Sequence, residues 1–247
     1  MPGANHEHVH RIEIAICTYN RADLLAATLA SVARLIVPYD CTLRLIVVDN
    51  ASTDNTPMVL EEFSKSAFTQ RHEVVLQNEP RQGHTLARNR AIESMDSDLV
   101  LWTDDDVEVG SRWLERYVNF ANEHPDDKFF GAAIEPQFET PPPAWVNENW
   151  SRLQGCFASR DLGDQPIPLT KDRLPYGANF AVRSPVQKQF PFDITLGRRG
   201  DAVQGEDELE MMRRMIDAGH SGRWVPDAPV RHRVDSSRVT ERYVRDY

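Results

Sequence analysis

The stretch Leu99-Val100-Leu101-Trp102-Thr103-Asp104-Asp105-Asp106 joins a short apolar run directly to three consecutive carboxylates. A continuous apolar run of this length is typical of a strand that is buried on both faces of a parallel sheet. In such sheets, ligands bind beyond the carboxyl ends of the strands. The stretch therefore predicts a buried strand at 99–103 whose end delivers acidic side chains to a binding site.

Strand and helix patterns alternate on both sides of this stretch. β-branched apolar runs predict strands, and apolar residues three and four apart predict helices with one buried face. The expected strands are 12–16, 43–48, 73–76, 99–103 and 129–134, and the expected helices are 21–35, 57–66, 84–94 and 111–122. This alternation is typical of an α/β fold, a mostly parallel central sheet flanked by helices.

The pattern changes after residue 134. Residues 135–176 are rich in proline, and we expect them to form an insertion over the site with little regular structure. Beyond this segment, the expected elements are strands at 179–182 and 223–225, a short helix from 184, a helix at 206–218 and the beginning of a helix at 239–247. One domain at 11–235 is expected, between a polar leader at 1–10 and a C-terminal tail at 236–247.

Composition excludes several classes of protein. The chain has 247 residues, with 28 Lys and Arg against 38 Asp and Glu, and its formal charge of −10 argues against nucleic acid as the main partner. Its three widely spaced cysteines suit neither a disulfide framework nor a zinc cluster, so we expect a cytoplasmic setting. No apolar run is long enough for a transmembrane segment. Peripheral membrane association and homo-oligomers stay open.

The three consecutive aspartates suggest a cation site. Adjacent carboxylates repel one another, so they are normally solvated or neutralised. At a strand end they suit Mg²⁺ or Mn²⁺, which commonly also bind substrate phosphates. The alternative is a solvated acidic loop. If the backbone stays extended, Asp104 and Asp106 face one site while Asp105 turns away.

Several other residues have both a functional and an ordinary interpretation. Asp49 ends an expected strand and either caps a turn or reads a base or ribose edge. Arg88 either pairs with the consecutive carboxylates or binds a phosphate, or it forms an ordinary surface ion pair. Arg198 and Arg199, flanked by glycines, suit a loop that closes over an anion. His232 is either a surface residue or a metal ligand.

Six short motifs follow one another along the chain. They are Ile16-Cys17-Thr18-Tyr19-Asn20-Arg21, Val47-Val48-Asp49-Asn50-Ala51-Ser52, Ala87-Arg88-Asn89, Asp104-Asp105-Asp106, Gly177-Ala178-Asn179 and Gly205-Glu206-Asp207-Glu208-Leu209. In this order and at these spacings, the chain resembles the family-two inverting glycosyltransferases over roughly residues 10–235. The resemblance implies a GT-A fold, with a nucleotide-binding half at 11–134 and an acceptor-binding half at 135–235.

The resemblance also implies roles for individual residues. The implied nucleotide and donor ligands are Thr18, Tyr19, Asn20, Arg21, Asp49, Arg88, Asp104, Asp105, Arg198 and Arg199, with Asp49 reading the base, typically uracil. The implied ligands of Mn²⁺ or Mg²⁺ are Asp104, Asp106 and His232. Asp207 matches the catalytic base, with Glu206 beside it. Asn179, Trp145 and Trp150 are candidates for the acceptor, although the tryptophans could instead pin the insertion to the core.

Together these features lead us to expect a metal-dependent inverting glycosyltransferase. It would move one sugar from a nucleoside diphosphate donor, UDP-linked by preference, to a hydroxyl of a glycan, lipid-linked glycan or small molecule. Processive relatives carry a Gln-x-x-Arg-Trp signature, but the glutamine is missing before Arg223-Trp224, which favours single addition. The alternatives are a sugar-nucleotide nucleotidyltransferase and an inactive nucleotide-sugar-binding module.

Overall fold

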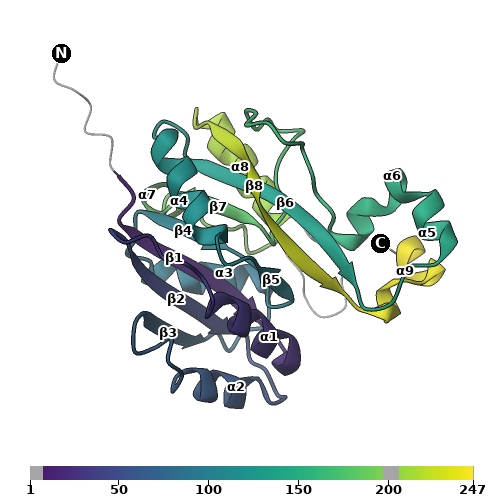
Figure 1. Ribbon diagram of the computed structural model, residues 1–247, viewed down its shortest axis with the longest axis horizontal. Coiled ribbons are helices and arrows are strands. Elements are labelled where there is room, and N and C mark those ends of the chain that lie inside the picture. Colours follow the sequence, from purple (N-terminus) through teal and green to yellow (C-terminus); the bar gives the residue numbers. More distant parts are fainter. Residues whose placement is uncertain (1–7, 197–205, 247) are drawn as a thin grey trace.

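A computed structural model describes residues 8–196 and 206–246 of the chain. Its strands are β1 Arg11–Thr18, β2 Thr42–Asp49, β3 Glu73–Asn78, β4 Leu99–Trp102, β5 Val107–Val109, β6 Phe129–Phe138, β7 Phe180–Arg183 and β8 Gly222–Val234. They form one eight-stranded sheet in the order β3-β2-β1-β4-β7-β6-β8-β5 (Figure 1). The first four strands in this order are parallel, whereas β7 runs antiparallel to both of its neighbours.

Helices cover both faces of this sheet. They are α1 Ala22–Val32, α2 Thr56–Phe63, α3 His84–Ser94, α4 Trp113–Glu123, α5 Ala144–Glu148, α6 Trp150–Leu153, α7 Ser184–Gln187, α8 Asp207–Asp217 and α9 Glu241–Asp246, with short 3-10 turns η1 Gln154–Phe157 and η2 Ser236–Arg238. Side chains of α1, α2 and α4 pack into one core cluster, and those of α3, α7 and α8 pack into the other. Along β1, Ile14 faces the first cluster and Ala15 the second, as strand alternation requires. The predicted α/β class, with a mostly parallel sheet between helices, is confirmed.

The longest departure from the prediction is β8, which was expected to be a short strand at 223–225. It continues through Pro226 and Pro229, which normally argue against a strand. In the ladder with β6, Val225 pairs with Ala132, but the next paired residue of β8 is Val230. Both prolines therefore lie in an irregularity where the ladder needs no N–H donor. The extended strand carries His232 to the ends of the parallel strands.

The proline-rich segment after β6 has more regular structure than predicted, because α5, α6 and η1 form within it. These helices and α9 lie together beyond the ends of β6 and β8 (Figure 1). Val146, Phe157 and Val234 form a small hydrophobic cluster there. Half-buried Trp145 and Trp150 pack against it, and the Trp150 ring is stacked on Phe157 with centroids 6.2 Å apart. The structure thus shows both tryptophans pinning this segment to the end of β8.

Among the residues that the structure describes, no helix combines the length and apolarity that crossing a bilayer requires.

Gly131 of β6 packs tightly against Pro175 of the segment that follows this strand. A Cβ atom at this position would lie 2.1 Å from Pro175 Cβ, and the proline ring has little freedom to move. We expect Gly131→Ala to lower the free energy of unfolding by about 1–3 kcal/mol, the usual cost of overpacking. Urea unfolding followed by circular dichroism measures the change.

Gly110→Ala is the matched control, because a Cβ atom at Gly110 has no neighbour within 4 Å. Its stability should change by less than about 0.5 kcal/mol. Equal effects of the two substitutions would contradict the close packing inferred at Gly131.

Candidate active site

A cavity of about 920 Å³ opens where the parallel strands end, as expected for an α/β sheet. Residues from all six sequence motifs line it or lie beside it. The lining includes Thr18, Tyr19, Arg21, Asn50, His84, Arg88, Asp104, Asp105, Asp106, Gly177, Glu206, Asp207, Glu208 and His232. Residues separated by more than two hundred positions in the chain, such as Thr18 and His232, thus converge on one site.

All three consecutive aspartates line this cavity. Asp105 and Asp106 are buried, and Arg21 Nη1 lies 2.9 Å from a carboxylate oxygen of each. The prediction that Asp105 turns away is wrong, because β4 ends at Trp102 and the chain enters a turn at Asp105. Burial, opposed by Arg21, raises the pKa of Asp105 to about 6. The interpretation as a solvated surface loop is also wrong.

His232 approaches the aspartates from β8. Its Nε2 lies 3.3 Å from Asp106 Oδ1, and both side chains are buried. Although burial acts in the opposite direction, His232 and Arg21 hold the pKa of Asp106 well below its usual range. Asp106 Oδ1 and His232 Nδ1 are buried atoms without a well-formed hydrogen bond. A carboxylate oxygen and an imidazole are ligand types that suit a divalent cation.

Arg88 holds together carboxylates from two different elements. Its Nη1 donates to Asp207 Oδ2 at 2.8 Å and lies 3.5 Å from Glu208 Oε2, while its Nη2 lies 3.7 Å from Asp104 Oδ1. Its side chain is only 3% exposed, so the interpretation as a surface ion pair is wrong. Its guanidinium also lies 5.0 Å from the centre of the Phe192 ring. One buried cation therefore joins the start of α8 to the end of β4.

Gly177 makes room for this arrangement. A Cβ atom here would lie 2.7 Å from Arg88 Nη2 and 3.2 Å from the Glu208 carboxyl carbon. Its backbone N–H donates to Glu208 Oε1 at 2.9 Å. Burial raises the pKa of Glu208, with Arg88 opposing the shift. The motif 177–179 thus contributes a backbone hydrogen bond, from Gly177 N to Glu208, that fixes the start of α8 beside the cavity.

Asp207, the predicted base, begins α8 and is 2% exposed. Burial favours its neutral form, but Arg88 and then His84 outweigh this and lower its pKa well below the usual range. Asp207 is therefore ionised at neutral pH. Glu206, with a positive φ of 89°, precedes the helix, and its side chain is exposed and pairs with Arg213 at 3.6 Å.

His84 is a site residue that sequence reasoning missed. It begins α3, lines the cavity, and its Nδ1 lies 3.9 Å from Asp207 Oδ2. Gly83 N donates to Asn50 Oδ1 at 2.8 Å, which ties the start of α3 to the end of β2. The available signal was the position of His84 directly after Gly83, at a helix start that faces the carboxyl ends of the strands.

The residues expected around the nucleotide form a hydrogen-bonded rim. Asn20, with a positive φ of 51°, accepts a hydrogen bond from Thr53 N at 2.7 Å. Tyr19 is 39% exposed, and its hydroxyl accepts one from Gln82 Nε2 at 2.6 Å. Asp49 is buried, and its Oδ1 accepts a hydrogen bond from Ser52 N at 2.9 Å. Asp49 therefore caps the turn after β2.

Two groups of predicted residues lie elsewhere, and a third falls outside the part of the chain that the structure describes. Asn179 is fully buried, and its amide bonds to Ala133 O, Ala228 O, Trp113 Nε1 and Tyr117 Oη, which gives it a structural role and no surface for an acceptor. Trp145 and Trp150 belong to the cluster beyond β8 and are absent from the cavity lining. Arg198 and Arg199 lie outside the described residues.

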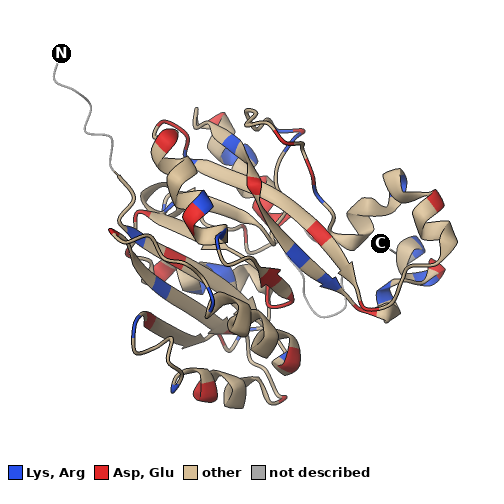
Figure 2. Cartoon of the chain, viewed as in Figure 1, with Lys and Arg blue, Asp and Glu red and all other residues tan. Residues whose placement is uncertain are grey.

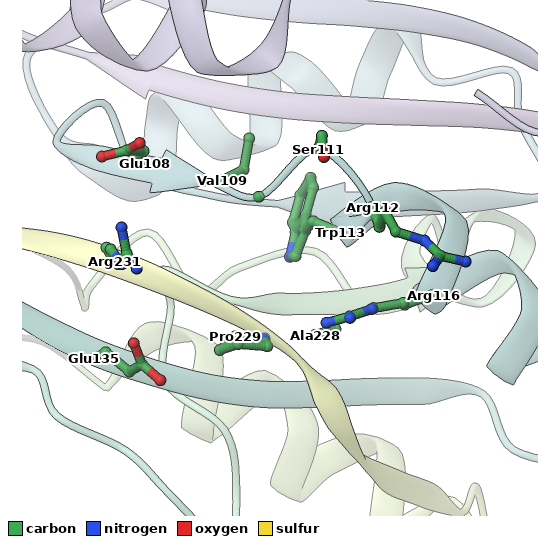
Figure 3. A pocket seen from close by; sticks show the side chains of 11 residues that line it. Glu108, Val109, Ser111, Arg112, Trp113, Arg116, Glu135, Ala228, Pro229 and Arg231 are labelled. Carbon is green, nitrogen blue, oxygen red and sulfur yellow. The ribbon is translucent and has the colours of Figure 1, made fainter. Parts of the chain in front are cut away.

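A second cavity, of about 440 Å³, lies on the other face of β8 (Figure 3). Because side chains alternate along a strand, Arg231 lines this cavity while His232 lines the larger one. Arg112 pairs with Glu115, and Arg116 pairs with Asp227. Among the described residues that line it, this second cavity lacks the converging buried carboxylates of the larger cavity. We therefore take the larger cavity as the active site.

Comparison with known proteins identifies the family. The profile of glycosyl transferase family 2 matches residues 13–179, about two thirds of the chain. The succinoglycan biosynthesis protein ExoM of Rhizobium meliloti is 31% identical over 232 residues, 93% of this chain and 69% of that protein. Glucosyl-dolichyl phosphate glucuronosyltransferase of Haloferax volcanii is 25% identical over 234 residues, 93% of this chain and 71% of that protein.

Solved structures show the same fold. The mannosyltransferase PcManGT from Pyrobaculum calidifontis, in complex with GDP-Man and Mn²⁺, superposes with a TM-score of 0.65 at 18% identity, covering 93% of this chain and 59% of that one. S. aureus TarS 1-349 in complex with UDP gives a TM-score of 0.67 at 17% identity, covering 91% and 60%. This chain therefore spans about three fifths of these solved chains.

The fold is thus the GT-A fold that these solved structures share. The chain belongs to glycosyl transferase family 2.

Removing the buried guanidinium should destabilise the protein strongly. Arg88→Met leaves the buried carboxylates of Asp207 and Glu208 without their cation, and breaking such a pair costs about 3–5 kcal/mol of unfolding free energy. The measurement is urea unfolding at neutral pH.

Arg90→Met, two residues further along the same helix, is the matched control. It removes an exposed pair with Glu93, and exposed pairs contribute less than about 1 kcal/mol. A loss for Arg88→Met no larger than for Arg90→Met would contradict the central role of Arg88.

Proposed function

We propose that this protein is a metal-dependent inverting glycosyltransferase that adds a single sugar per encounter. The donor is a nucleoside diphosphate sugar, UDP-linked, and the acceptor is a hydroxyl of a glycan, lipid-linked glycan or small molecule. The supporting observation is the Arg88 guanidinium, which contacts both the proposed base Asp207 and Asp104 of the cation site. One rigid group thereby fixes the proton acceptor relative to the leaving group.

Asp104, Asp106 and His232 are the residues proposed to hold Mn²⁺ or Mg²⁺. Their support is the buried Asp106 oxygen without a well-formed hydrogen bond, 3.3 Å from the imidazole. When bound, the cation would neutralise the charge that develops on the leaving diphosphate. Arg21, which now balances Asp105 and Asp106, lies where it can also contact donor phosphates.

Asp207 is the proposed general base. The acceptor hydroxyl is a weak nucleophile and must lose its proton as it attacks the anomeric carbon. A carboxylate on the face opposite the leaving group permits a single displacement, which inverts the anomeric centre. The low pKa of Asp207 keeps it ready to accept a proton, at the expense of basicity. Glu206 is exposed at the edge of the cavity, and its proposed place is beside the bound acceptor.

The preference for a UDP-linked sugar rests on Asp49, which ends β2 beside the cavity-lining Asn50. Among the solved structures of this fold, TarS is complexed with UDP and with UDP-GlcNAc, whereas PcManGT is complexed with GDP-Man. The alternative of a nucleotidyltransferase has less support, because the loop at 18–21 contains no glycine. An inactive binding module is opposed by the buried, ionised Asp207.

The base assignment predicts a split between binding and chemistry. Asp207→Asn should retain binding of UDP-sugar in Mn²⁺ but lose transfer by about 10²-fold or more, the usual contribution of a positioned base. Asp106→Ala, in contrast, should lose the Mn²⁺ dependence of donor binding. Calorimetric titration with UDP-, GDP- and dTDP-sugars and a diphosphate-release assay measure both effects.

Asp217→Asn is the control for Asp207→Asn, because Asp217 is an exposed residue at the other end of α8. It should leave both binding and transfer unchanged. Full transfer by Asp207→Asn would remove the base assignment, and unchanged Mn²⁺ dependence in Asp106→Ala would remove the cation site.

His84 should act as a positioning residue through Asp207. Its imidazole contributes to the low pKa of that carboxylate, so His84→Leu should raise the pKa of Asp207. The acid limb of the pH profile of kcat/KM should therefore move to higher pH. His72→Leu, which changes a histidine remote from the cavity lining, should leave the profile unmoved. A shift to lower pH in His84→Leu would contradict the assignment.

A further inference from the structure

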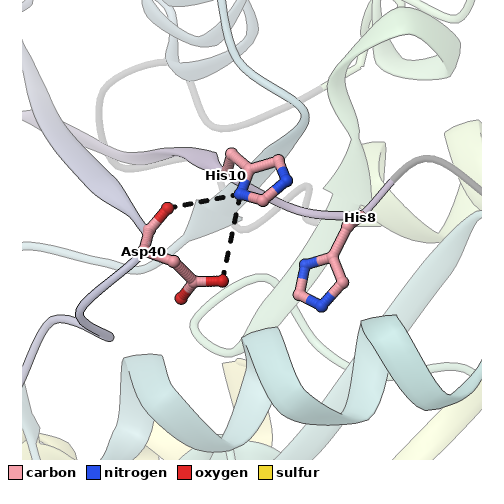
Figure 4. A group of neighbouring side chains, drawn as sticks. All are labelled: His8, His10 and Asp40. Atoms are coloured by element: carbon pink, nitrogen blue, oxygen red, sulfur yellow. Dashed lines mark hydrogen bonds and ion pairs between the residues drawn. The ribbon is translucent and has the colours of Figure 1, made fainter.

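Three exposed side chains meet at the opposite end of β1 from the active site. They are His8, His10 and Asp40, and one ligand atom of each lies within 4.8 Å of those of the other two (Figure 4). The His8 and His10 rings are stacked with centroids 5.0 Å apart. His10 Nδ1 lies 3.2 Å from Asp40 O and 4.0 Å from Asp40 Oδ2.

The fold holds this group in place through its backbone. Val9, between the two histidines, is fully buried, whereas His8 and His10 on either side of it are exposed. Val9 N donates to Asn122 Oδ1 at 2.8 Å, and His10 N donates to Asp98 Oδ2 at 2.9 Å. Asp40 is fixed from the other side, because Thr42 N, two residues later, donates to His10 O at 2.8 Å.

The donor set determines which ion would bind. Imidazole suits Zn²⁺, Ni²⁺ and Cu²⁺, whereas Mg²⁺ prefers sites built from oxygen ligands. We propose that His8, His10 and Asp40 form a second cation site, selective for Zn²⁺-like transition metals, that clamps the segment before β1 to the start of β2.

This site is separate from the proposed catalytic cation site. β1 runs from Arg11 to Thr18, so His10 and the cavity lie roughly 25 Å apart along the strand. Loss of the second site should therefore leave sugar transfer in Mn²⁺ unchanged. Because the metal binds the folded arrangement of two segments, it should raise the apparent stability of the protein.

The test uses the full chain without any added histidine tag. Thermal unfolding is followed while Zn²⁺, Ni²⁺ or Mg²⁺ is titrated into the parent and into the double variant His8→Ala/His10→Ala. We expect Zn²⁺ and Ni²⁺ to raise the Tm of the parent more than that of the double variant, and Mg²⁺ to show no such difference. The difference between parent and variant isolates this site from any metal bound in the active-site cavity.

Asp40→Asn separates a built site from chelation by the terminal peptide alone. It should weaken the apparent Zn²⁺ affinity by at least roughly tenfold, a loss that even an outer-shell partner of a metal can cause. Asp23→Asn, an exposed carboxylate on α1, is its control, and His72→Ala is the control for the histidines. Equal Zn²⁺ shifts in parent and double variant, or an Asp40→Asn variant that binds like the parent, would overturn the proposal.

Discussion

The buried guanidinium of Arg88 is the interaction on which the active site depends. Burying a cation is costly unless it is paired, and here Asp207, Glu208 and Asp104 compensate it together. Lysine could not replace it, because a single ammonium cannot reach carboxylates on two elements from one position. Gly177 follows from the same constraint, since any side chain there would occupy the space of the guanidinium. The ion pairs therefore explain the local sequence as well as the geometry.

Under the proposed function, an acidic protein must bind an anionic donor, and the charge of the cavity bears on how it would do so. Among the described residues, seven carboxylates and four guanidiniums line it, so 4 − 7 gives a formal balance of −3 without the histidines. Such a cavity would repel a bare diphosphate, and a divalent cation bound between the donor and the aspartates would offset two of these negative charges. Elsewhere, acidic and basic residues are interspersed along the chain (Figure 2). The overall charge of −10 therefore does not indicate the charge of the donor.

Patterns that report burial predicted most of the fold, and motif order predicted most of the site. Apolar runs located the parallel strands and put the three consecutive aspartates at their carboxyl ends, whereas Asp207 was expected at the site from the family resemblance. The sequence could not reveal that β8 passes two prolines, because a ladder irregularity depends on the partner strand. It misplaced Asp105 because the prediction assumed an extended backbone through Asp106, whereas the chain leaves β4 at Trp102 and turns at Asp105. Asn179 shows what a motif cannot predict. The motif placed this residue near the site, but its side chain points into the core, where its amide donates to Ala133 O and Ala228 O.

Under the proposed function, the weak basicity of Asp207 follows from the same guanidinium that positions it. In the structure, Arg88 divides its charge between Asp207, Glu208 and Asp104. Negative charge that enters beside Asp104 competes with Asp207 for that cation, and exclusion of water penalises the ionised carboxylate further. Both effects raise the pKa of Asp207 as the donor and acceptor fill the cavity. The carboxylate thus becomes a stronger base when the acceptor hydroxyl arrives, while Arg88 keeps it ionised and oriented beforehand.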